Sequence, residues 1–71
     1  MPKLPHLSGA EIIRALERLG FMQVRQKGSH VMLRRGSAGC VVPLHPELAP
    51  GTLRGIRKQA QIEIDEFRRM L

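Results

Sequence analysis

The sequence predicts a small α+β protein in which helices cover one face of a three-stranded antiparallel sheet. Apolar residues recur at helical spacing early in the chain, alternate with polar residues in the middle, and return to helical spacing near the end. Twenty of the 71 residues are Leu, Ile, Val or Phe, which is enough apolar content for a chain to fold. We expect one domain over residues 1–71, with residues 1–7 as a short N-terminal arm.

The first helix is expected over about residues 9–19. Ser8 and Glu11 have the spacing of a capping box, in which each side chain bonds the backbone N–H of the other. Gly20 follows the last apolar position and is typical of a helix end.

Three strands are expected to follow, over residues 21–27, 30–35 and 40–44. Gly28-Ser29 and residues 36–39 have the composition and length of hairpin connections. The middle of the chain should therefore be an antiparallel meander.

The second of these strands predicts which face of the sheet is covered. Successive strand side chains point to opposite faces, so Val31 and Leu33 should share the face that the helices cover. His30, Met32 and Arg34 should then lie on the open face.

Two more helices are expected at the end of the chain, completing the order α-β-β-β-α with a short additional helix. Thr52 is a good N-cap for a helix that begins at Leu53. Residues 62–71 carry acids near their start and arginines near their end, as the helix dipole favours. The helix after Thr52 has an outward basic face, formed by Arg54, Arg57 and Lys58.

The charge balance favours a polyanionic partner. Twelve Lys and Arg oppose six Asp and Glu, for a net charge of +6, and nine of the twelve are Arg, which binds phosphate bidentately. RNA or DNA is favoured over a membrane, and the scarcity of aromatic residues favours contacts to the backbone over base stacking. The single Cys40 excludes an internal disulfide, and we expect a cytoplasmic location.

Few residues could support catalysis. The six acids have expected roles in helix caps, at helix ends or on the surface, and the glycines form no phosphate-binding loop. We therefore expect no metal site and no small-molecule cofactor. Three histidines remain as candidates, of which His6 lies in the arm.

His30 is the strongest candidate, because Arg25, Lys27 and Arg34 lie near it in the sequence. An imidazole exchanges a proton near neutral pH, and RNA carries its own nucleophile in the 2′-hydroxyl. One histidine with cations around the phosphate is the minimum for cleaving RNA without a metal. The alternative interpretation of His30 is an exposed polar residue beside a turn.

Two further places could contact phosphate. His45 is a second acid or base, a phosphate contact, or simply a loop residue. The helix start at Gly51-Thr52 offers free N–H groups and a hydroxyl, with Arg54 following. A capped helix with a solvated basic face explains the same residues equally well.

Several segments together resemble the HicA (YcfA-like) family of toxins from type II toxin–antitoxin systems. They cover nearly the whole chain in order: LERLGF at 16–21, VRQKGSH at 24–30, VPLH at 42–45 and PGTL at 50–53. The resemblance implies a double-stranded-RNA-binding-like fold, mRNA interferase activity with His30 as the catalytic residue, and a HicB-type antitoxin as partner. Val31 and Met32 stand where many relatives have a His or an aromatic residue.

The leading hypothesis is a metal-independent endoribonuclease that acts on mRNA. A noncatalytic RNA- or DNA-binding module is the alternative, and a structural adaptor for a protein partner is a third. The residues expected to contact RNA phosphates are Arg25, Lys27, Ser29, Arg34, His45, Thr52, Arg54, Arg57 and Lys58.

Overall fold

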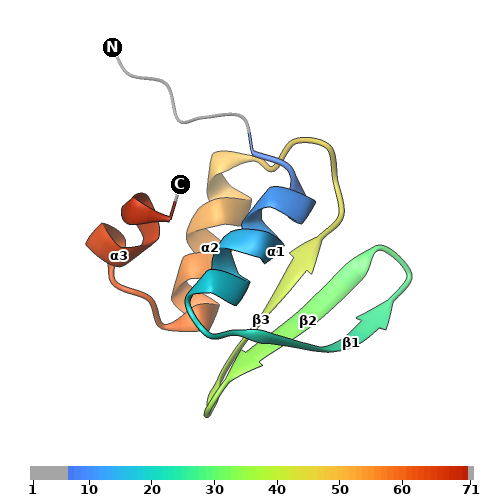
Figure 1. Ribbon diagram of the computed structural model, residues 1–71. Coiled ribbons are helices and arrows are strands. Elements are labelled where there is room, and N and C mark those ends of the chain that lie inside the picture. Colours follow the sequence, from blue (N-terminus) through green and yellow to red (C-terminus); the bar gives the residue numbers. More distant parts are fainter. Residues whose placement is uncertain (1–6, 71) are drawn as a thin grey trace.

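The computed structural model describes residues 7–70 and contains three helices and three strands within them (Figure 1). In chain order these are α1 (Gly9–Arg18), β1 (Met22–Lys27), β2 (His30–Arg35), β3 (Ala38–Pro43), α2 (Pro50–Ala60) and α3 (Ile64–Arg69). This order confirms the α+β class and the expected sequence of elements. His6 and the rest of the expected arm lie outside the described residues, except for Leu7, which is buried against the core.

Helix α1 begins at the expected capping box. The N–H of Glu11 donates to the hydroxyl of Ser8 at 3.1 Å, and the N–H of Ser8 donates to the carboxylate of Glu11 at 3.0 Å. Two of the N–H groups that a helix start leaves unpaired are thereby satisfied. The helix ends at Arg18, one residue before the expected end, and Gly20 follows with a φ of +96°.

The three strands form an antiparallel sheet in the order β1-β2-β3. The expected bounds of β2 are confirmed, but β3 begins two residues earlier than the predicted 40–44 and ends one residue earlier. Arg35 pairs directly with Ala38, so the β2–β3 turn has two residues instead of the four predicted over 36–39. Gly36 has a φ of +59°, and this left-handed backbone allows the tighter turn.

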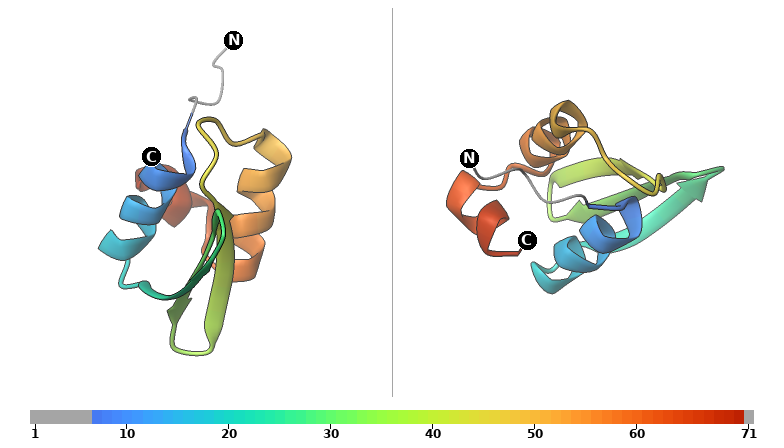
Figure 2. Two further views of the ribbon diagram at one scale, coloured as in Figure 1. Left: turned by 90° about the vertical axis from the view of Figure 1, so that its right-hand side faces the viewer. Right: turned by 90° about the horizontal axis from the view of Figure 1, so that it is seen from above.

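Helices α1 and α2 cover one face of the sheet, as predicted. Val31 and Leu33 of β2 are buried on that face, whereas His30, Met32 and Arg34 are exposed on the other. Figure 2 shows the two helices side by side, with α3 at the end of the molecule opposite the β1–β2 turn. The core is completed by apolar side chains of both helices and β3, among them Ile12, Leu16, Val42, Leu53 and Ile56.

Helix α2 begins earlier than predicted. Thr52 is not its N-cap: the N-cap is Ala49, which makes no side-chain capping bond, and Pro50 is the first helical residue. Proline suits this position because its fixed φ matches the helix and its missing N–H would have been unpaired there. Thr52 is therefore the third residue of the helix, inside its first turn.

The C-terminal helix is shorter than the predicted 62–71. Gln61 adopts a left-handed conformation with a φ of 56° and ends α2, so that α3 begins only at Ile64. The buried side chain of Phe67 attaches α3 to the core. The acids and arginines occupy the two ends of α3 in the order that the helix dipole favours.

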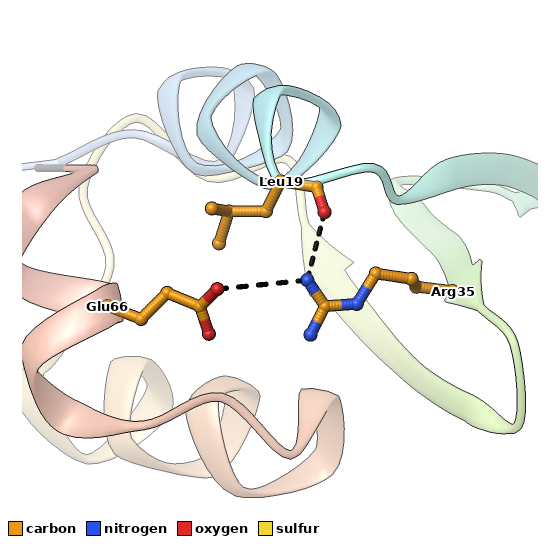
Figure 3. Close-up of polar contacts among 3 residues, drawn as sticks. All are labelled: Leu19, Arg35 and Glu66. Carbon is orange, nitrogen blue, oxygen red and sulfur yellow. Dashed lines mark hydrogen bonds and ion pairs between the residues drawn. The ribbon is translucent and has the colours of Figure 1, made fainter.

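A single arginine connects the end of the sheet to two helices. The guanidinium of Arg35 donates to the carbonyl of Leu19 at 2.9 Å and lies 4.0 Å from the carboxylate of Glu66 (Figure 3). The same guanidinium lies over the ring of Phe21, 4.7 Å from its centroid. Arg35 therefore has a structural role, at the end of β2 distant from His30.

Candidate functional site

The open face of the sheet brings His30 together with the basic residues that the sequence placed near it. In the register of the sheet, Lys27 of β1 lies opposite His30, and Pro43 of β3 lies on its other side. The next row along the strands is Arg25, Met32 and Val41, and the row after that is Met22, Arg34 and Gly39. Because directly paired residues share a face, all three cations are on the face of His30.

A β-bulge sets the composition of this face. Val24 is an extra residue of β1, because Gln23 pairs with Leu33 while Arg25 pairs with the adjacent Met32. A bulge reverses the alternation of side chains beyond it. Gln23 consequently points to the α1 side, where its amide donates to Glu17 at 3.4 Å, and Met22 joins the open face.

A shallow hollow of about 250 Å³ lies on this face, lined by side chains from all three strands. Its lining residues are Arg25, Lys27, His30, Met32 and Val41. The two apolar side chains are in the middle row of the sheet, beside the histidine and the cations. None of the lining residues is acidic, so the hollow favours an anion that carries an apolar group.

The β1–β2 turn positions His30 at the edge of the hollow. Gly28, the first residue of the turn, has a φ of +58°, a conformation that glycine adopts without strain. The side-chain amide of Gln26 donates to the carbonyl of Gly28 at 3.0 Å. The N–H of Leu44 donates to the carbonyl of Ser29 at 2.7 Å, which joins this turn to the chain leaving β3. Ser29 itself is exposed.

His45 lies at the same end of the sheet as His30 but outside the hollow. It follows Leu44, whose N–H is bonded to Ser29, and its own carbonyl accepts a 2.9 Å hydrogen bond from the N–H of Gly9. Its side chain is exposed. The structure therefore fixes the backbone of His45 close to the turn that carries His30.

Of the predicted basic face of α2, Arg54 and Lys58 are exposed. Arg57 is half-buried, and its guanidinium donates to the carbonyl of Ile62 at 3.1 Å, so it holds the connection between α2 and α3. Gln59, on the flank of α2, accepts a hydrogen bond from the N–H of Val41 at the free edge of β3. Helix α2 thus presents a second, separate basic surface beyond this edge.

Met32 and Val41 are the two residues of the hollow that the sequence reasoning did not assign to the site. The alternation in β2 placed Met32 on the face of His30, which was a usable signal. Val41 gave no such signal, because its position depends on the pairing of β2 with β3. The carbonyl of His45 likewise has a partner that is distant in sequence, the N–H of Gly9.

Other candidate groups have structural explanations. Cys40 is buried on the covered face, as expected for a small apolar residue, and burial raises the pKa of its thiol to about 11. Within residues 7–70, no three His, Cys, Asp or Glu side chains gather as a metal-binding group. In the same part of the chain, none of the helices combines the length and apolar character needed to cross a membrane.

The fold and the site define a small α+β protein whose open sheet face carries one histidine among three cations. A family model described as the HicA toxin of bacterial toxin–antitoxin systems matches residues 9–62. The chain therefore belongs to the HicA toxin family, which confirms the resemblance seen in the sequence. The match ends before α3, and it includes the hollow and both basic surfaces. The search of curated proteins gave no match.

Proposed function

We propose that this HicA-family protein is an endoribonuclease that cleaves mRNA at His30 without a metal ion. The observation that carries the proposal is the convergence of His30, Lys27 and Arg25 around one hollow on the open sheet face. A proton-exchanging group next to fixed positive charge is what RNA needs in order to react through its own 2′-hydroxyl. The toxin role of the family supports an activity that damages an RNA of the cell.

The reaction would be an intramolecular transesterification of the RNA backbone. The 2′-oxygen attacks the adjacent phosphorus, the bond to the 5′-oxygen breaks, and the products are a 2′,3′-cyclic phosphate and a 5′-hydroxyl. His30 either accepts the proton of the 2′-hydroxyl, with water protonating the leaving 5′-oxygen, or donates a proton to that oxygen while water takes up the proton of the 2′-hydroxyl. Lys27, Arg25 and Arg34 stabilise the negative charge that builds up on the phosphate oxygens.

The two basic surfaces would have different tasks. Cations of the open sheet face act at the reacting phosphate, whereas Arg54 and Lys58 of α2 hold flanking RNA backbone, and Thr52 and His45 add further phosphate contacts. Arg57 contributes mainly to the structure, since its guanidinium is bonded to Ile62. With a single proton-transfer group in the hollow, the proposed enzyme is slow, because general acid–base catalysis supplies only ~10²–10⁴-fold.

A partner is part of the proposal. A toxin of this class requires an antitoxin, and we infer a HicB-type protein that covers the exposed, cationic open face and so blocks the hollow. An acidic surface on that partner would match the charge of the face. Co-expression with the neighbouring reading frame, followed by purification, tests whether such a complex forms.

The activity is tested with purified protein and a defined RNA in the presence of EDTA. Wild type should cleave the RNA and leave 2′,3′-cyclic phosphate ends, and His30→Ala should lose at least 100-fold in rate. Added imidazole should restore part of the activity of His30→Ala, because it replaces the missing group. An RNA with 2′-deoxyribose at the cleaved position should resist wild type.

Controls separate this proposal from its alternatives. Arg68→Ala removes one exposed charge from α3, at the end of the molecule opposite the β1–β2 turn, and should cleave as wild type does. Arg25→Ala should cleave the RNA more slowly than wild type, because it lacks one of the cations that stabilise the charge on the phosphate. Equal cleavage by wild type and His30→Ala would disprove the mechanism, and RNA binding without any cleavage would favour the noncatalytic nucleic-acid-binding module.

A further inference from the structure

The hollow beside His30 has a floor that phosphate recognition does not explain. This floor is formed by Met32 and Val41, which lie opposite each other on paired strands in the middle row, beside Arg25. Met32 is 39% exposed, which leaves a large apolar side chain in contact with water next to the cations Arg25 and Arg34 of this face. A site that bound only phosphate would gain nothing from these two side chains, because a phosphate group makes no favourable apolar contact.

The chemistry of this floor suits the flat face of a nucleobase. The thioether of methionine is polarisable and makes favourable contacts with aromatic rings, and valine adds apolar area. Arg25, in the same row, has a planar guanidinium of the kind that stacks on rings. Together these side chains can replace the aromatic residues that RNA-binding sheets commonly use, since the two aromatic residues of this chain, Phe21 and Phe67, are both buried.

The size of the hollow limits the ligand to about one nucleobase. At about 250 Å³ it is smaller than the roughly 300–1,000 Å³ of pockets that enclose whole drug-sized ligands. A base on the middle row has His30 and Lys27 in the neighbouring row, about 7 Å away along the strands. The sugar and phosphate of the same nucleotide would then lie toward the histidine.

We propose that the hollow is a subsite for one unpaired nucleobase, which stacks on Met32 and Val41 while its phosphate lies at His30 and Lys27. This inference rests on the proposed function and specifies its substrate as single-stranded RNA, because a base within a duplex has both faces already stacked. The floor offers no hydrogen-bonding side chain, so the subsite accepts all four bases with little discrimination. Met32 is a binding residue in this arrangement and takes no part in proton transfer.

The test measures the affinity of short RNA oligonucleotides by fluorescence anisotropy, with His30→Ala protein so that no cleavage interferes. The oligonucleotides form a set in which each member carries one abasic ribose, at a different position. Removal of the base at one position should weaken binding roughly five- to tenfold, at the lower end of the range for a stacked base. Annealing the intact oligonucleotide to its complement should weaken binding as well.

The variants identify the side chain responsible. Met32→Ser, added to His30→Ala, should bind the intact oligonucleotide as weakly as the abasic one, and should show no further loss with the abasic one. Met22→Ser is the matched control, since Met22 is on the same face, is 70% exposed and does not line the hollow. It should retain the full abasic effect.

The outcomes separate this inference from the proposed function. If no abasic position changes the affinity, or if Met32→Ser remains sensitive to the abasic site, the base subsite is disproved, even where wild type cleaves RNA in a His30-dependent way. If the abasic effect depends on Met32 but wild type does not cleave, the subsite stands and the nuclease activity fails. If Met32→Ser binds RNA normally but no longer binds the antitoxin, Met32 and Val41 form a contact surface for the protein partner instead of a base subsite.

Discussion

The backbone N–H of Gly9 donates a 2.9 Å hydrogen bond to the carbonyl of His45, and this contact joins the start of α1 to the loop beyond β3. Gly9 is buried, and a Cβ at this position would overlap the carbonyl of Pro43. The first helical residue is therefore packed directly against the backbone at the end of β3. Together with the bond from the N–H of Leu44 to the carbonyl of Ser29, this contact holds the loop containing His45 between α1 and the turn that carries His30.

Gly9→Ala should destabilise the protein by about 2–3 kcal/mol, because an added methyl group must displace rigid backbone. Gly55→Ala is the matched control: it is within α2, has open space around its Cβ position, and should stabilise the protein by about 0.5–1 kcal/mol. Urea unfolding of both variants measures the two effects. Equal free energies of unfolding for Gly9→Ala and wild type would contradict the close contact.

The capping box should make part of the stability of the protein depend on pH in the acidic range. The backbone N–H of Ser8 is the main cause that lowers the pKa of Glu11, and the Ser8 side chain and the charge of Arg14 add to it. A lowered pKa in the folded state stabilises the protein above the unfolded pKa of about 4.3, and this contribution is lost as the pH falls through the folded value.

The stability difference between wild type and Glu11→Gln should therefore shrink as the pH is lowered from 6 to 3. Ser8→Ala should reduce stability at pH 7 by about 1 kcal/mol through loss of the cap. Urea unfolding at several pH values measures both effects. A difference between wild type and Glu11→Gln that stays constant over this range would refute the assignment.

Arg35 should contribute to stability through its hydrogen bond and its ring contact rather than through its ion pair. Arg35→Met removes the bond to Leu19 and the cation over Phe21, and should cost about 1–3 kcal/mol. Glu66→Gln removes only a partly exposed 4.0 Å pair and should cost less than about 0.5 kcal/mol. Thermal or urea unfolding should rank the two variants in this order, and a larger loss for Glu66→Gln would reverse our interpretation.

The arginines and lysine of α2 should separate into structural and RNA-binding residues. Arg57→Ala should lower the free energy of unfolding by about 1–2 kcal/mol, since it removes the bond to Ile62. Lys58→Ala should leave stability nearly unchanged and reduce the salt dependence of single-stranded RNA binding by about 0.7 in the slope of log affinity against log salt. Unfolding and salt-titrated binding of both variants provide the measurements. An unchanged salt slope for Lys58→Ala would remove α2 from the proposed RNA path.

Most of the fold could be predicted because it follows from short-range patterns. The spacing of Ser8 and Glu11 predicted the start of α1, and the alternation through β2 predicted which of its side chains are buried. The start of α2 was predicted wrongly. Thr52 is a good cap in isolation, but the helix already begins at Pro50, whose fixed φ suits the first helical position. The β2–β3 turn was also predicted too long, since the pairing of Arg35 with Ala38 is a property of both strands.

By itself, the sequence determined the order of elements, the covered face of the sheet, the basic character of the chain and His30 as the candidate residue. These depend on neighbours within a few positions, where side-chain spacing and charge are directly visible. Only the tertiary structure decided the bulge at Val24, the rows that bring Arg25 and Val41 beside Met32, and the structural role of Arg35. Such features depend on strand register and on contacts between distant segments, and a slip of one residue would have placed different side chains around His30.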